Sequence, residues 1–239
     1  RQAASSKIIL NAHRINKGEM PYYTNKQNDD FFFIELNEPD DIIARMMSII
    51  SQRLPALYQV NPLTDIQVLV PMNKGTLGVK NLNVVLQECL NPNKEVTITS
   101  MGVNFRQGDK ILQTVNNYDK DVFNGDIGYI RTINLEDDLI TIQYDERMVE
   151  YNKSELDEID LAYAISIHKS QGSEYPIVVT PITTQHYNML ERNLLYTGVT
   201  RGKKMVILIG QKKALYMAVK RVSANKRITS LDLKLNNVN

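Results

Sequence analysis

The sequence of 239 residues has no tryptophan and a single cysteine, Cys89. One cysteine cannot form a disulfide within the chain, which favours a reducing compartment and predicts a cytoplasmic protein. No apolar run reaches the roughly 18 residues that span a bilayer, and residues 1–30 hold no signal-peptide core. These absences argue against a membrane protein and a disulfide-stabilised secreted domain. The sequence begins with Arg1 rather than Met, so we expect a piece of a longer chain.

Signatures of several enzyme classes are also missing. The phosphate-binding loop G-x-x-x-x-G-K-[ST] does not occur, because residues 75–80 have the wrong spacing and no hydroxyl after the lysine. The three histidines show no metal-ligand spacing, and there is no G-x-S-x-G nucleophile elbow. Residues 140–146 superficially resemble a magnesium-binding strand that ends in Asp-Glu. Their alternation of apolar and polar residues instead predicts a half-exposed edge strand, so we predict no metal site in this chain.

Charge is distributed unevenly although the net charge is only +1. Residues 1–100 are balanced, residues 101–160 hold 6 basic and 14 acidic side chains, and residues 161–239 hold 12 basic and 3 acidic ones. A basic segment can mark a surface that faces a polyanion, but it is as often an ordinary solvated face. Charge alone therefore leaves nucleic-acid binding open.

Apolar strands alternate with amphipathic helices in the first and last parts of the chain. Apolar runs predict buried strands at 31–34, 66–70, 177–179 and 205–209. Helical spacing predicts a helix from Asp40 that ends at Pro55, and further helices at 79–89, 189–199 and 215–222. We place Cys89 on the buried side of its helix. This alternation is typical of an α/β fold with a parallel sheet covered by helices on both faces.

The middle of the chain has a different character. Short β-rich runs are separated by turn signals at 116–117, 124–125 and 137–138. We therefore predict a small β-barrel at 101–155, inserted into an α/β domain that is formed by 1–100 and 156–239.

Three polar stretches lie beside the predicted strands, where ligands of open α/β sheets usually bind. Residues 168–174 (HKSQGSE) resemble motif V of the superfamily 1 DNA helicases in their RecD-like branch, which includes the exodeoxyribonuclease V alpha subunit. Residues 195–202 (LYTGVTRG) resemble motif VI, except that glycine replaces the usual alanine at 198 and 202, and residues 11–16 (NAHRIN) resemble the motif IV region. Residues 70–79 resemble a further signature, and 105–110 with 122–126 are similar to the family's inserted SH3-like barrel.

The resemblance implies the second RecA-like domain of an ATP-dependent DNA helicase, interrupted by an SH3-like barrel. Such a motor translocates on single-stranded DNA, 5′-to-3′ in this branch, and unwinds duplex. ATP with Mg²⁺ would bind between two RecA-like domains. The first of these, with the phosphate loop and the magnesium ligands, would precede Arg1. The fragment alone is then expected to lack ATPase activity.

The resemblance also implies roles for individual residues. Arg201 would be the arginine finger and Arg14 a second catalytic arginine at the γ-phosphate. The residues that would bind ATP are Arg14, Gln171, Gly172, Glu174 and Arg201. The residues that would bind DNA are Asn73, Lys74, Gly75, Ser166, His168, Lys169 and Asn116. The implied partners are single-stranded DNA, duplex ends, ATP, the N-terminal RecA-like domain of the same chain and other exodeoxyribonuclease V subunits, with no membrane.

Two alternative hypotheses, in which the chain has no motor activity, stay open at this point. The chain could be a stand-alone nucleic-acid-binding module, or a protein-docking module, because an acidic barrel suits protein contacts better than phosphate contacts. The sequence also does not separate a stand-alone helicase from an exodeoxyribonuclease V subunit.

Overall fold

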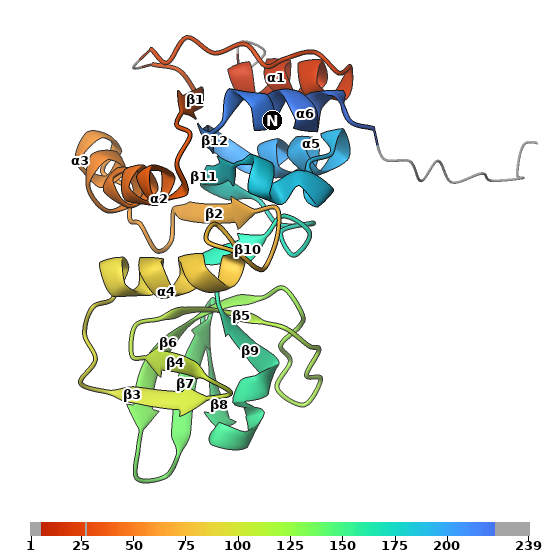
Figure 1. Ribbon diagram of the computed structural model, residues 1–239. Helices are drawn as coiled ribbons and strands as arrows, with labels where there is room; N and C mark the ends of the chain where they lie inside the picture. The colour runs from red at the N-terminus through yellow and green to blue at the C-terminus, as the bar shows by residue number, and fades with distance from the viewer. Residues whose placement is uncertain (1–5, 27, 223–239) are drawn as a thin grey trace, which may run out of the picture.

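The central feature of the computed structural model, which describes residues 6–26 and 28–222, is a five-stranded sheet (Figure 1). All its strand pairs are parallel. In spatial order the strands are β1 (Phe31–Glu35), β12 (Gly202–Gly210), β11 (Tyr175–Ile182), β2 (Ile66–Val70) and β10 (Ala164–Ser166). Each lies on a run that the apolar pattern selected, apart from the short β10.

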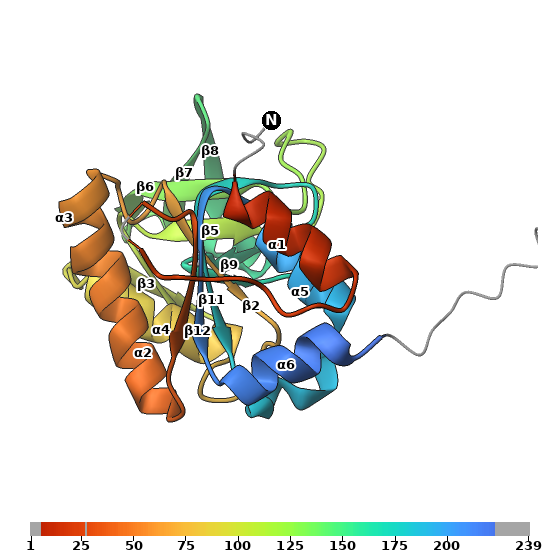
Figure 2. The ribbon, with the colours of Figure 1, turned by 90° about the horizontal axis from the view of Figure 1, so that it is seen from above.

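Helices cover both faces of this sheet (Figure 2). On one side lie α1 (Lys7–Asn16), α5 (Arg192–Thr200) and α6 (Lys212–Lys220), and on the other lie α2 (Pro39–Ser48), α3 (Leu54–Tyr58) and α4 (Val79–Leu90). Neighbouring residues of β12 point to different cores, because Val206 packs with the first group and Ile207 with the second. This alternation confirms the predicted doubly covered α/β fold.

The helix that begins at residue 39 continues past Pro55, so the prediction that this proline ends it was wrong. After α2 the chain makes a π-helical turn (Ile49–Arg53), and Pro55 then lies in the first turn of α3. Proline is tolerated there because the first N–H groups of a helix have no partner within it. The helix ends at Gln59, whose φ of 53° is left-handed.

The chain between α4 and β10 forms an antiparallel sheet and a hairpin. The sheet has the spatial order β8-β7-β6-β5-β9, and the hairpin pairs β3 with β4. The strands are β3 (Thr97–Ser100), β4 (Val103–Arg106), β5 (Lys110–Gln113), β6 (Ile127–Asn134), β7 (Leu139–Tyr144), β8 (Arg147–Asn152) and β9 (Ile159–Leu161). A short 3-10 helix, η2 (Lys153–Glu158), precedes β9. The predicted domain boundaries stay a prediction.

Two expectations about individual segments differ from the structure. β7 alternates between buried and half-buried residues as expected, but it lies between β6 and β8 and is not an edge strand. One of its faces covers the barrel interior while the other faces solvent, which gives an inner strand the same pattern. Cys89 is only half-buried, because α4 turns Asn83 and Gln87 toward the interior instead.

Candidate nucleotide and DNA site

Two loops that the motifs singled out meet at the carboxyl ends of neighbouring strands. β2 and β10 pair in parallel with Val70 opposite Ser166, so both strands end at the same level. The loop after β2 carries Asn73, Lys74 and Gly75, all exposed. The chain after β10 carries the motif V segment. The structure therefore places these two predicted DNA-binding stretches side by side.

A groove of about 530 Å³ runs along α4 and reaches this edge. It lies between α4, the β3–β4 hairpin and the chain around β9 and β10, and its lining includes Asn73, Ser166 and Lys169. The Ser166 hydroxyl accepts a hydrogen bond from the Lys169 amide (3.2 Å), and Lys169 Nζ lies 3.2 Å from an Asp160 carboxylate oxygen. Lys169 is thus presented at the groove by a turn that Ser166 stabilises.

The next part of motif V faces the start of α5. His168 and Gln171 line a cavity of about 180 Å³ together with Asn193 and Thr197. Gly172 follows with φ of 90°, a left-handed conformation that L side chains rarely adopt. The segment then enters β11, whose first residue pairs with the first residue of β12. Residues 167–174 therefore run from the carboxyl edge of the parallel sheet to its amino edge.

Arg201 lies at that amino edge, at the carboxyl end of α5. Its half-buried guanidinium donates to the carbonyl oxygens of Ser173 (3.0 Å) and Thr197 (3.3 Å) and to the Thr200 hydroxyl (3.3 Å). The Tyr175 amide donates to the Arg201 carbonyl (2.8 Å), which joins the end of motif V to the end of motif VI. The orientation of this arginine is thus fixed by the motif V chain itself.

Glycine at position 202 is required by packing. A Cβ atom there would lie 2.4 Å from a methyl carbon of Val206. The departure from the usual alanine of motif VI therefore matches the close approach of Val206 and leaves Arg201 in place.

Glu174 and Lys203 form an exposed ion pair next to Arg201, with Nζ and carboxylate oxygen 3.0 Å apart. The hydrogen bond from Lys203 holds the pKa of Glu174 below its usual value, and the charge of Arg201 acts in the same direction. Sequence reasoning missed Lys203, whose one signal was its place two residues after the motif VI arginine. The structure thus gathers two cations and one carboxylate at this edge.

Arg14 makes its own local contacts. Its Nε donates to the Met20 carbonyl (2.8 Å), and one of its terminal nitrogens lies 3.4 Å from a Glu19 carboxylate oxygen. Both members of this ion pair are well exposed, so the pair contributes under about 1 kcal/mol.

The structure does not bring Arg14 to Arg201. Arg14 lies in the last turn of α1, and Gly18, just after that helix, abuts the guanidinium of Arg192, the first residue of α5. Arg201 caps the opposite end of α5. A nine-residue helix is about 13 Å long, so the two predicted catalytic arginines stand at opposite ends of it.

Asn116 lies in the loop between β5 and β6, which approaches motif V. Its side-chain oxygen accepts a hydrogen bond from the Asn124 amide (2.9 Å). Residues 124–126 of this loop line a cavity of about 460 Å³ together with His168 and Lys169. The barrel loop therefore stands next to the predicted DNA-binding segment.

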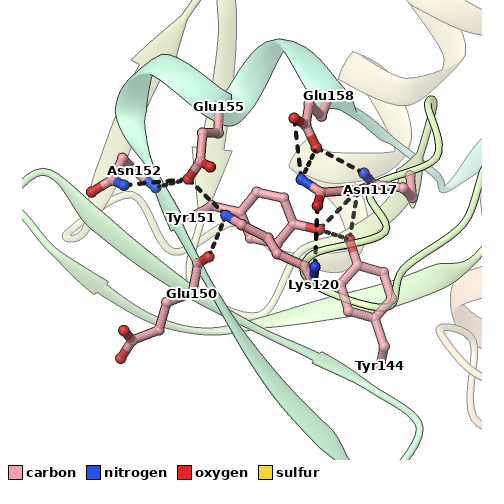
Figure 3. A network of polar contacts seen from close by, with 9 residues as sticks. Asn117, Lys120, Tyr144, Glu150, Tyr151, Asn152, Glu155 and Glu158 are labelled. Carbon is pink, nitrogen blue, oxygen red and sulfur yellow. Dashed lines mark hydrogen bonds and ion pairs between the residues drawn. The ribbon is translucent and has the colours of Figure 1, made fainter.

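A buried polar network fixes the base of this loop (Figure 3). The hydroxyls of Tyr144 and Tyr151 donate to the side-chain oxygen of Gln113, at 3.1 and 2.9 Å. The amides of Gln113 and Asn117 both donate to Glu158, each at 3.0 Å. Burial raises the pKa of both tyrosines, so their hydroxyls stay protonated donors.

Lys120 holds the other side of the loop (Figure 3). Its Nζ lies 2.7 Å from both the Glu150 carbonyl and the Glu155 carboxylate, and 4.2 Å from the centre of the Tyr151 ring. The hydrogen bond from Lys120 keeps the pKa of Glu155 low. The loop is therefore tied to β8 and η2 before any ligand binds.

The described residues form neither a metal-binding cluster nor a membrane-spanning helix. Within 6–26 and 28–222, no three His, Cys, Asp or Glu side chains gather as a metal site would require. In the same ranges no helix is long and apolar enough to cross a membrane.

Comparison with known proteins identifies the family. Residues 82–144 match a family model described as the SH3 domain of ATP-dependent RecD-like DNA helicases, and residues 161–209 match the UvrD-like helicase C-terminal domain. The ATP-dependent RecD2 DNA helicase of Deinococcus radiodurans is 35% identical over 92% of this chain and 29% of its own length. The chain belongs to the RecD-like DNA helicases.

Other relatives of this RecD-like chain agree. The RecBCD enzyme subunit RecD of Mycolicibacterium smegmatis is 27% identical over 84% of the chain and 34% of its own length. The chain thus spans about a third of the length of these relatives. The crystal structure of Pif1 helicase from Bacteroides with ADP-AlF3 and single-stranded DNA shares the fold, with a TM-score of 0.53 at 13% identity, over 98% of this chain and 54% of that one.

Proposed function

We propose that this chain is the C-terminal motor part of an ATP-dependent DNA helicase, with Arg201 as its arginine finger. The observation that carries the proposal is the Arg201 guanidinium, which Ser173, Thr197 and Thr200 hold beside the end of motif V. Arginine stays charged and its planar fork matches phosphate oxygens. An arginine so placed stabilises the charge that spreads over the γ-phosphate during phosphoryl transfer.

The residues around Arg201 fit a nucleotide. Arg201 and Lys203 supply positive charge, Gly172 leaves open space where a side chain would stand, and Glu174 offers a carboxylate to a ribose hydroxyl. Gln171 borders this region from the cavity at α5. ATP with Mg²⁺ would supply the phosphoryl group. The phosphate loop and the magnesium ligands that hold it would come from an N-terminal RecA-like domain of the full-length chain.

Arg14 stays a weaker candidate for the same role. To contact one phosphate together with Arg201, it would have to reach along the length of α5 from its present contacts with Glu19 and Met20.

For DNA we propose the opposite edge of the sheet. Asn73, Ser166 and Lys169 share one groove there, Lys74 and Gly75 stand on the same loop, and His168 and Asn116 approach it from motif V and the barrel. Motif V runs between the two edges and would link the state of the nucleotide to the grip on single-stranded DNA. Translocation 5′-to-3′ and duplex unwinding belong to this proposal.

The decisive experiment replaces Arg201 by lysine in the full-length protein. The charge is kept but the fork is lost, so we expect DNA-stimulated ATP turnover to fall by about 10³-fold. Affinity for single-stranded DNA should stay within about twofold. Arg45→Lys is the matched control, because Arg45 is an exposed residue of α2 at the other face of the sheet. It should change neither ATP turnover nor DNA affinity.

Unchanged turnover in Arg201→Lys would refute the arginine finger. Measurable ATPase activity of residues 1–239 alone would refute the shared site.

One observation favours a second function, the docking of protein. Residues 101–160, which include most of the barrel, hold 14 acidic and 6 basic side chains, and this excess of negative charge repels phosphate. A barrel that docks other exodeoxyribonuclease V subunits would leave the DNA affinity of the full-length protein unchanged on removal. If it instead contacts phosphates, its removal would lower the salt dependence of that affinity. A cytoplasmic location stays a prediction.

A further inference from the structure

The barrel and the parallel sheet are joined by a very short segment. Leu161, the last residue of β9, pairs with Ile111 in the antiparallel sheet. Three residues later, Ala164 pairs with Val68 in the parallel sheet. The chain thus passes from one sheet to the other through two residues, Ala162 and Tyr163, which we call the connection. α4 lies between the two sheets at this point (Figure 1).

Asn83 of α4 binds both ends of the connection. Its side-chain amide donates to the carbonyls of Leu161 and Ala164, each at 2.9 Å, and its side-chain oxygen accepts from the Ala164 amide at 2.8 Å. The residue is 6% exposed. Gln67 of β2 donates to the carbonyl of Ala162 (3.0 Å). The end of β9 and the start of β10 are therefore both held by the Asn83 side chain.

Asp109 holds the middle of the connection. Its fully buried carboxylate accepts from the Tyr163 hydroxyl (2.7 Å), the Gln87 amide (2.6 Å), the Asn91 amide (2.8 Å) and the Arg106 backbone amide (2.7 Å). Burial raises the pKa of Asp109, and these four donors oppose that shift. One carboxylate therefore ties α4, the β4–β5 turn and the connection together.

Polar contacts of this kind specify position more sharply than apolar ones. Apolar packing is non-directional, whereas a satisfied buried network permits one arrangement, and a shift of any member leaves a buried group unpaired. Ser166 stands two residues after Ala164 in the same short strand. The connection and Ser166 are thus separated by two residues of one short strand, and the Ser166 hydroxyl in turn accepts a hydrogen bond from the Lys169 amide.

We propose that Asn83 and Asp109 are positioning residues for DNA binding: they lock the connection so that the barrel and the strand that presents Ser166 and Lys169 move as one body. The inference rests on the proposed function, because it assumes that Ser166 and Lys169 contact DNA. It assigns a role to two residues that act through other parts of the chain. Asn83 borders the same groove, but it is 6% exposed and its side-chain amide and oxygen are engaged with Leu161 and Ala164.

The test uses Asn83→Asp in the full-length protein. The change replaces the donating amide by a carboxylate that faces the carbonyls of Leu161 and Ala164. We expect the concentration of single-stranded DNA that half-saturates the ATPase to rise about tenfold, while basal ATPase activity stays unchanged. Asp109→Asn, which is isosteric but turns donors toward donors, should act in the same direction. It also provides the test if Asn83→Asp does not fold.

Val149→Ala is the matched control for lost stability. Val149 is buried in β8, at the far edge of the barrel sheet from β9 and the connection. We expect it to lower the melting temperature without moving the DNA half-saturation. If Asn83→Asp lowers the melting temperature but leaves half-saturation at the parent value, the residue is merely structural and the proposal fails. It also fails if Val149→Ala raises half-saturation equally.

Amide hydrogen exchange separates this proposal from the proposed function. The Ile167 amide donates to the Val70 carbonyl (3.0 Å) and the Ser170 amide to the Ser166 carbonyl (3.2 Å), so both report on the position of motif V. We expect faster exchange at both in Asn83→Asp and parent rates in Val149→Ala. Faster exchange with unchanged half-saturation contradicts the DNA role of Ser166 and Lys169. Unchanged exchange contradicts the lock itself.

Discussion

The parallel sheet and the antiparallel sheet fill their interiors differently. Among the described residues, five buried side-chain atoms have no hydrogen-bond partner. Four belong to β2, β11 or the segment after β11, namely Gln67 Oε1, Thr180 Oγ1, Thr183 Oγ1 and His186 Nδ1, and the fifth, Arg106 Nε, belongs to the β3–β4 hairpin. In the barrel, the buried hydroxyls of Tyr144 and Tyr151 both have partners. Both regions therefore have apolar cores, and in the barrel side-chain hydrogen bonds additionally fix the loop between β5 and β6.

The largest effect is expected where the two regions join. Lys110 of β5 is 3% exposed, and its Nζ donates to the carbonyl of Ile66 (3.3 Å) in β2. Burial lowers its pKa to about 7, and the nearby charge of Asp65 opposes this only in part. Between pH 7 and 10 the unfolded chain holds a proton that the folded chain has lost. The free energy of unfolding should therefore rise with pH, by roughly 4 kcal/mol over that interval.

Lys110→Met tests this by urea unfolding across the same pH range. The variant has no titrating group at this position, so it should lack the rise and be the more stable protein at pH 7. Parallel pH profiles for the two proteins would show that Lys110 keeps its charge in the folded state. The buried place where β5 meets β2 would then hold a charged group, which contradicts an apolar junction between the two sheets.

A smaller effect is expected inside the parallel-sheet region, at His186. Its Nε2 lies 3.3 Å from the Leu77 carbonyl, and burial lowers its pKa to about 4. Between pH 6.5 and 4 the unfolded chain binds a proton that the folded chain does not, so stability falls as pH falls. From pH 7 to pH 5 we expect a loss of roughly 2 kcal/mol. Urea unfolding of His186→Gln, which can still donate to Leu77, should lack this loss. An equal loss in both proteins would assign it to carboxylates elsewhere.

The same comparison explains what the sequence could predict. The strands β1, β2, β11 and β12 are apolar runs, and a run is a local property that needs no knowledge of partners. The motif segments could be found because each of them is also a contiguous stretch of sequence. Contacts such as that of Tyr163 with Asp109, 54 residues apart, depend on which distant groups meet, and no local pattern encodes them.

Where a prediction was wrong or a residue was missed, the structure depends on features that no local sequence pattern shows. The π-helical turn before Pro55 lets the helix continue, although proline alone predicts an end. The roles of Arg14 and Arg201 stay predictions. Their separation follows from the end of α1 lying at the start of α5, which neither segment encodes by itself. Lys203 gained its significance only through the Glu174 carboxylate that the fold places beside it.

The smallest effect is expected in the barrel, at Tyr151. Tyr151→Phe keeps the ring under Lys120 and removes only the hydroxyl that donates to Gln113. Because Tyr144 still donates to the same oxygen, we expect a loss of about 1 kcal/mol in the free energy of unfolding. Amide exchange in the loop at 114–126 should accelerate, since Gln113 also fixes Glu158, and through it Asn117. Val149→Ala, which removes apolar volume from the same barrel, should cost at least as much stability and leave the loop unchanged. If the two variants loosen the loop equally, hydrogen bonds do not fix it, and the barrel is ordered by the same apolar packing as the parallel sheet.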